Sequence, residues 1–107
     1  MLSKKNRMDR NLYTEVFNRG RAIHTPLLFC KYKKDVSKKR FSAVIAKKIL
    51  HQAHDRNSLR RFVYDVIQPE IDNMAPASVI FILKKTFLES NKVQLKKEIK
   101  ETLSKLS

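Results

Sequence analysis

The chain has 107 residues, which is enough for one domain with one hydrophobic core and too few for two. Hydrophobic residues make up 42% of it, so it is expected to fold rather than stay disordered, and no apolar run approaches the ~20 residues of a membrane-spanning helix. Cys30 is the only cysteine, which excludes an intrachain disulfide and a cysteine metal cluster.

Positive charge is concentrated in one part of the sequence. The chain holds 24 Lys and Arg against 10 Asp and Glu, a formal charge of +14, and residues 1–61 carry 17 of the basic and only 4 of the acidic side chains. Such asymmetry predicts a surface for a polyanion more than it predicts general solubility, and it does not favour a membrane as the partner. Residues 1–8 form a basic arm without the apolar stretch of a secretion signal, so we expect a cytoplasmic protein.

The first predicted element is a helix over about residues 10–19. Asp9 or Asn11 can cap its N-terminus, and Gly20, the only glycine, stands where a left-handed helix stop would need it. Its apolar face consists of Leu12, Tyr13, Val16 and Phe17.

Two strands are predicted next. Residues 21–26 form a connection, residues 27–33 are strand-like in their aromatic and apolar content, and residues 34–40 form a charged turn. A second strand follows at residues 41–46.

Residues 54–67 form an amphipathic helix with two different faces. One face has the apolar spacing of a helix that packs on a sheet: Leu59, Phe62, Val63, Val66 and Ile67. The other presents Asn57, Arg60, Arg61 and Tyr64, with Arg56 near the border. Because guanidinium groups bind phosphate as planar forks, this face predicts a phosphate-binding surface; the alternative is a solvated basic exterior.

The remainder predicts a loop or a frayed turn at residues 70–77, a buried strand at 78–83 and a last helix with a capping box of Asn91 and Gln94. The apolar stripe of that helix is Leu88, Leu95, Ile99, Leu103 and Leu106. The predicted fold is therefore an α/β (α+β) two-layer sandwich of order α-β-β-α-β-α. It has three helices on a small sheet of about four strands and a parallel crossover between residues 41 and 83. Because the order α-β-β-α-β-α contains three strands, the fourth would be an extra short strand.

Catalytic or metal-binding constellations are weakly represented. His51 and His54 with the adjacent Asp55 could begin a zinc site, but a third and a fourth ligand are not supplied, so no metal site is expected. The four acids before Arg61 are widely dispersed, which argues against an autonomous nuclease.

Several motifs in order resemble one known family. They are Val44-Ile45-Ala46-Lys47-Lys48 followed by Arg56-Asn57-Ser58-Leu59-Arg60-Arg61, with Tyr13, Phe17, Gly20-Arg21 and Pro26-Leu27-Leu28 before them. Over nearly the whole chain, the sequence resembles the protein subunit of bacterial ribonuclease P, which removes 5′ leaders from precursor tRNA. Ser58 and Tyr64 depart from the family, which commonly has basic residues there.

The resemblance implies a single RNA-binding domain, residues 1–107, that assists an RNA catalyst and supplies no catalytic side chain. It implies two partners, the ribonuclease P RNA subunit and precursor tRNA, with no protein partner required, and Mg²⁺ acting through the RNA with no cofactor held by the protein. It also implies a left-handed crossover. The alternative is a non-catalytic basic RNA-binding protein, such as a ribosomal protein or an RNA chaperone.

Two groups of site residues follow from the resemblance. The expected contacts to the RNA subunit are Lys47, Lys48, Arg56, Asn57, Arg60, Arg61 and Tyr64. The expected contacts to the leader lie in a cleft between the first helix and the sheet: Tyr13 and Phe17, with Phe29 or Lys31 on the floor according to strand register.

Overall fold

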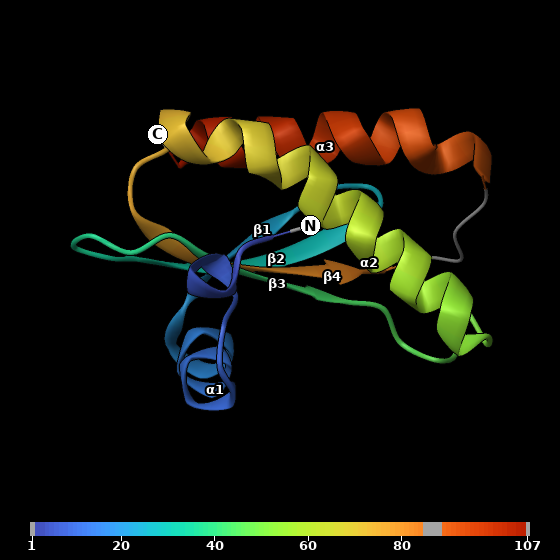
Figure 1. The fold of residues 1–107 in the computed structure, drawn as a ribbon, viewed down its shortest axis with the longest axis horizontal. Helices are drawn as coiled ribbons and strands as arrows, with labels where there is room; N and C mark the ends of the chain where they lie inside the picture. Colours follow the sequence, from blue (N-terminus) through green and yellow to red (C-terminus); the bar gives the residue numbers. More distant parts are fainter. Residues whose placement is uncertain (1, 85–88, 107) are drawn as a thin grey trace.

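A computed structural model describes residues 2–84 and 89–106 of the chain (Figure 1). Within these two ranges, three α-helices, four strands and three short 3₁₀ segments follow one another. In chain order they are η1 (Lys4–Asn6), α1 (Arg10–Arg19), β1 (Arg21–His24), β2 (Leu28–Lys34), β3 (Arg40–Val44), α2 (Ala53–Ile67), η2 (Gln68–Asn73), β4 (Ala77–Leu83), η3 (Glu89–Asn91) and α3 (Lys92–Lys105).

The strands form one mixed sheet in the order β1-β2-β4-β3. β2 is antiparallel to both β1 and β4, whereas β3 and β4 are parallel and are connected through α2. The predicted α+β class, with three helices and a parallel crossover, is thereby confirmed; the handedness of the crossover stays a prediction. The structure has three layers and not the two that were predicted, because α1 lies on one side of the sheet and α2 and α3 lie on the other (Figure 1).

The hydrophobic core lies between the sheet and the helix pair α2 and α3. Alternate residues of each strand point into it, as the two-residue period of a strand requires. From the strands it contains Leu28, Cys30, Phe41, Ala43, Ala77, Val79, Phe81 and Leu83. On the opposite side, Val16 of α1 and Ile80 of β4 are also fully buried. The central strand β4 is therefore buried on both faces, as its apolar run predicted.

β1 is the strand that the sequence did not show. Residues 21–26 were predicted as a connection, but Arg21–His24 pairs with Tyr32–Phe29 of β2 at the edge of the sheet. Only Ile23 of its four residues is partly buried, so the strand carries no apolar alternation that a sequence pattern could reveal. It is the short extra strand.

Gly20 ends α1, but not in the left-handed conformation that was predicted. Its φ of −74° and ψ of 164° are extended, and any residue can adopt them. Glycine is needed because a Cβ atom there would lie 2.4 Å from the Val16 carbonyl oxygen and 2.8 Å from that of Tyr32. The residue allows α1 to turn closely over β2.

One helix cap was predicted correctly and one was not. Asp9 caps α1 by accepting a hydrogen bond of 2.8 Å from the Leu12 N–H. The capping box of α3 is wrong, because Asn91 makes no side-chain cap and Gln94 donates to Glu98 Oε2 at 2.7 Å. Leu88, predicted for the apolar stripe of this helix, lies outside the described residues; the other four stripe residues are buried.

The buried carboxylate of Glu98 joins α3 to the link between β1 and β2. It accepts hydrogen bonds from the Leu27 N–H at 2.9 Å and from the Thr25 hydroxyl. A buried charge is stable only when its oxygens are satisfied in this way. Cys30 lies in the same region, and burial raises the pKa of its thiol to about 12, which makes it an inert core residue.

The N-terminal segment packs against the edge strand β3 instead of extending as an arm. Leu2 is 2% exposed, the Asn6 side-chain amide donates to the Lys39 carbonyl at 2.8 Å, and the Met8 N–H donates to the Phe41 carbonyl at 3.3 Å. The segment thus covers part of a strand edge that would otherwise expose unpaired backbone groups.

The amphipathic pattern of α2 predicted its packing well. Leu59, Val63, Val66 and Ile67 are buried against the sheet. Phe62 is only partly buried and lies under the Lys92 ammonium, 5.4 Å from the ring centroid. The helix then continues into the 3₁₀ segment η2, with Pro69 in its first turn. Of the two predicted alternatives for this region, a loop or a frayed turn, the structure agrees with the turn.

Candidate nucleic-acid interface

Five residues form an aromatic surface on the α1 side of the sheet: Tyr13, Phe17, His24, Phe29 and Lys31. The Tyr13 and Phe17 rings lie one helical turn apart with their centroids 6.0 Å apart and their planes at 16°. Phe17 is 41% exposed, although it is a large apolar side chain. Exposed aromatic rings held on a rigid element can stack with unpaired bases, at ~1–3 kcal/mol per base.

Both β2 candidates belong to this surface. Phe29 or Lys31 was expected according to register, but residues two apart project from the same face of a strand, so register cannot separate them. The Lys31 ammonium lies 6.0 Å from the ring centroids of both Phe17 and Phe29, and it donates to the Gly20 carbonyl at 3.4 Å. A cation between two rings keeps their faces beside a positive charge, which suits an aromatic site for a polyanion.

His24 joins the aromatic surface from β1 and was missed by the sequence. Its ring centroid lies 4.7 Å from that of Phe29, with the planes tilted by 31°. The two residues are cross-strand partners in the β1–β2 pair. His24 could have been found only by predicting the strand β1. The sequence of that strand shows no apolar alternation, so no such prediction was made.

Of the residues predicted for the outer face of α2 and the turn before it, some are exposed and two are bonded to the backbone of neighbouring segments. Asn57 and Arg61 are exposed, and Arg60 donates to Asn57 Oδ1 at 2.8 Å, one turn away on the same face. Lys47 and Lys48 are exposed in the turn between β3 and α2. Four of these five side chains are exposed and Arg60 is partly exposed, so their contact with phosphate stays a prediction.

Arg56 and Tyr64 are directed inward. Arg56 Nη1 donates to the carbonyls of Leu50 and His51 at 2.9 and 2.8 Å, so this side chain fastens the β3–α2 link to the first turn of α2. The Tyr64 hydroxyl accepts a hydrogen bond of 3.4 Å from the Ala43 N–H on β3, and its ring packs against the core. Both residues support the basic face structurally, with part of their bonding capacity already used.

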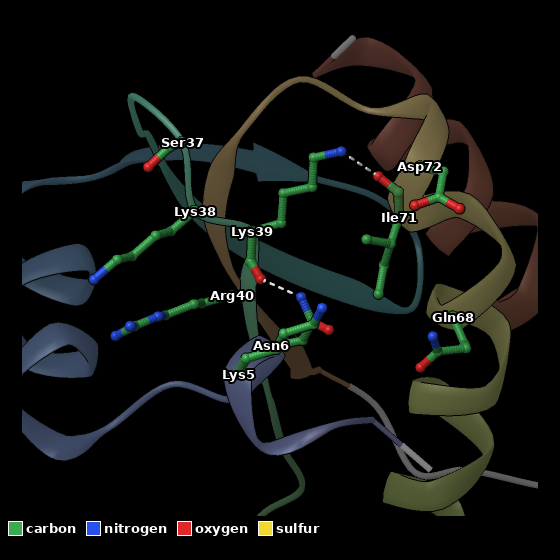
Figure 2. A pocket seen from close by; sticks show the side chains of 9 residues that line it. All are labelled: Lys5, Asn6, Ser37, Lys38, Lys39, Arg40, Gln68, Ile71 and Asp72. Carbon is green, nitrogen blue, oxygen red and sulfur yellow. Dashed lines mark hydrogen bonds between the residues drawn. The ribbon is translucent and has the colours of Figure 1, made fainter.

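A hollow of about 430 Å³ lies between the N-terminal segment, the start of β3 and η2 (Figure 2). The Lys39 ammonium donates to the Ile71 carbonyl at 2.7 Å across it, while Lys38 and Arg40 point away from η2. Asp72 also lines the hollow and offsets its positive charge. The bonds across this hollow hold three segments together, which is a structural role.

No group of three or more His, Cys, Asp or Glu side chains within residues 2–84 and 89–106 is placed to hold a metal ion. His54 Nε2 lies 3.1 Å from Asp55 Oδ1, which gives that histidine a neighbouring carboxylate. Within the same ranges, no helix is long and apolar enough to cross a membrane.

A small basic α+β domain with an aromatic surface beside its sheet and an arginine-bearing helix is typical of proteins that bind RNA through unpaired bases and phosphates. The description of the matching family model is Ribonuclease P, and it covers residues 2–107. The chain therefore belongs to the ribonuclease P family, which connects it with tRNA processing and with ribonuclease P RNA. No curated protein sequence matches it.

Solved structures share the fold at low sequence identity. The ribonuclease P protein of Thermotoga maritima superposes with a TM-score of 0.80 at 16% identity, over 94% of this chain and 97% of that one. The Staphylococcus aureus ribonuclease P protein gives a TM-score of 0.71 at 15% identity, over 96% and 93% of the two chains. The fold is thus retained although most side chains differ.

Proposed function

We propose that this chain is the protein subunit of ribonuclease P that binds the 5′ leader of precursor tRNA and the catalytic RNA subunit. The aromatic surface carries the first half of the proposal. Phe17 stays exposed beside Tyr13, Phe29 and the Lys31 ammonium, although apolar side chains of this size are normally buried. Stacking on such rings tolerates any base, as a leader of variable sequence requires.

The basic face of α2 carries the second half. Asn57, Arg60 and Arg61 share the outer face of α2, and the apolar face of the same helix fixes their position on the sheet. Lys47 and Lys48 are exposed in the turn that precedes this helix. Family membership supports the RNA subunit as the polyanion that this face contacts. In this proposal the RNA performs the cleavage with its Mg²⁺ ions, and the protein contributes binding and charge neutralisation.

The test is cleavage of a precursor tRNA at limiting Mg²⁺ by the protein alone, by a bacterial ribonuclease P RNA alone, and by both together. We expect no cleavage by the protein, and cleavage at lower Mg²⁺ when both are present. Leader removal by the protein without RNA would contradict the proposal in favour of an autonomous nuclease. Saturable RNA binding without any effect on cleavage would favour a ribosomal protein or an RNA chaperone.

A further inference from the structure

A second basic region lies where α1 meets the sheet, away from the outer face of α2. It is a hollow of about 410 Å³ lined by Arg19, Gly20, Arg21, Tyr32, Lys33 and Lys34. β1 begins at Arg21, opposite Tyr32, so β2 extends two residues beyond the start of its neighbour. The hollow opens at this uncovered end of the strand edge.

Most of the positive charge around the hollow is not compensated. Lys33 Nζ lies 3.1 Å from Glu15 Oε2, and both side chains are about half exposed. In the part of the chain that the structure describes, no salt bridge joins Arg19, Arg21 or Lys34 to a carboxylate. Arg19 also stabilises the C-terminal end of the α1 dipole, but this accounts for only one of the charges. A concave surface ringed by one sign of charge concentrates counter-ions of the other.

The hollow adjoins the aromatic surface. Gly20 lines the hollow, and its carbonyl accepts the hydrogen bond from the Lys31 ammonium of the aromatic surface. Lys31 and Lys33 project from the same side of β2, about 6.6 Å apart along the strand. Gly20 therefore separates the aromatic surface from the hollow. A single-stranded RNA that stacks on Phe17 and continues past Gly20 would bring its next phosphates to the hollow.

We propose that this hollow binds phosphates of the precursor leader, upstream of the nucleotides that stack on the aromatic surface. The inference rests on the proposed function for the location of the leader, and it adds a phosphate site formed by Arg19, Arg21, Lys33 and Lys34. Lys33 projects on the α1 side of the sheet, whereas Lys34 and Arg21, the partner of Tyr32, alternate to the other side and line the hollow at the end of the strands. These contacts are to the backbone, so they add affinity for longer leaders without selecting sequence.

The test uses the holoenzyme and precursor tRNAs whose leaders are lengthened one nucleotide at a time. Affinity of the unaltered holoenzyme should rise first as the leader covers the aromatic surface and again as it reaches the hollow. The double variant Arg19→Gln with Arg21→Gln should lose the second rise and keep the first. Losing two single-strand phosphate contacts flattens the slope of log K against log salt by about 1.4, which is roughly fourteenfold in affinity at ~0.15 M salt.

Two matched variants separate the site from net charge. Lys96→Gln with Lys97→Gln removes the same charge from exposed positions on α3 and should leave the second rise unchanged. Glu15→Gln releases Lys33 and should strengthen binding of long leaders, a gain that misfolding cannot produce, whereas Glu101→Gln on α3 should not.

Three results would overturn the inference: a loss equal to that of the α3 control, an equal loss for short and long leaders, or a loss of affinity for the RNA subunit instead of the leader. Failure of the proposed function looks different. In that case Phe17→Leu would not weaken binding even of precursors whose short leaders end on the aromatic surface.

Discussion

The two sides of the sheet differ in how completely helices cover them. On one side, α2 and α3 span 15 and 14 residues and close over a continuous hydrophobic core. On the other, α1 has 10 residues, a length of ~15 Å, and it buries Val16 while leaving Phe17 exposed. The same strands therefore contribute a core on one side and a partly covered aromatic surface on the other.

β2 shows the contrast within a single strand. Leu28 and Cys30 are buried on the α2 and α3 side, whereas Phe29 and Lys31 between and beyond them are only half-buried on the α1 side. An alternating strand needs a polar or partly covered face, and here an aromatic ring and a lysine occupy it. The comparison predicts that substitutions on the covered side act on stability and that substitutions on the α1 side act on binding.

The largest expected effect is on the covered side. Phe81→Ala removes a ring that is 1% exposed and should lower the free energy of unfolding by ~3–5 kcal/mol, measured by urea denaturation. Phe17→Ala, which removes an exposed ring of the same size, should change it by no more than ~0.5 kcal/mol. Equal losses for the two variants would abolish the distinction between the sides.

The second prediction concerns Gly20, which joins α1 to the sheet, and it is tested by Gly20→Ala. The new methyl group would meet the backbone carbonyls of Val16 and Tyr32, which cannot rotate away, so we expect a loss of ~1–3 kcal/mol. Asn18→Ala, at an exposed position two residues earlier, is the control and should be nearly neutral. A Gly20→Ala protein as stable as the unaltered one would mean that neither carbonyl lies so close to residue 20.

On the α1 side, Tyr13→Leu and Phe17→Leu keep apolar bulk but remove the stacking faces. Each should weaken binding of precursor tRNA by the holoenzyme roughly 5- to 150-fold, which corresponds to ~1–3 kcal/mol per base. Mature tRNA, which lacks the leader, should bind as before. Equal losses for both ligands would assign these rings to the core and place the leader elsewhere.

The last effect concerns the outer face of α2, which points away from the sheet. Arg60→Ala with Arg61→Ala should flatten the slope of log K against log salt for the RNA subunit by ~1.4–1.8, because two phosphate contacts are lost. Lys96→Ala with Lys97→Ala provides the same change of charge on α3. If slope and affinity are unchanged and the circular dichroism spectrum is normal, Arg60 and Arg61 do not contact the RNA and are only solvated surface residues.

Local pattern and capping chemistry made much of this protein predictable from its sequence. The α2 face of Leu59, Val63, Val66 and Ile67, the Asp9 cap and the apolar run of β4 each depend on neighbours a few residues away. Such signals are legible because helix and strand periods determine which side chains share a face. The ordered motifs around the same elements also identified the family.

Only the tertiary structure decided features that depend on distant backbone. The Val16 carbonyl of α1 is the nearest obstacle to a side chain at Gly20, but the second obstacle, the Tyr32 carbonyl, comes from another element. β1 exists because β2 offers it an edge, although its own residues show no strand pattern. Arg56 and Tyr64 looked like members of the basic face, and they turn inward because carbonyls of the β3–α2 link and an amide of β3 come within reach. Helical spacing assigns a side chain to a face, but its hydrogen-bond partners depend on which other segments the fold brings there.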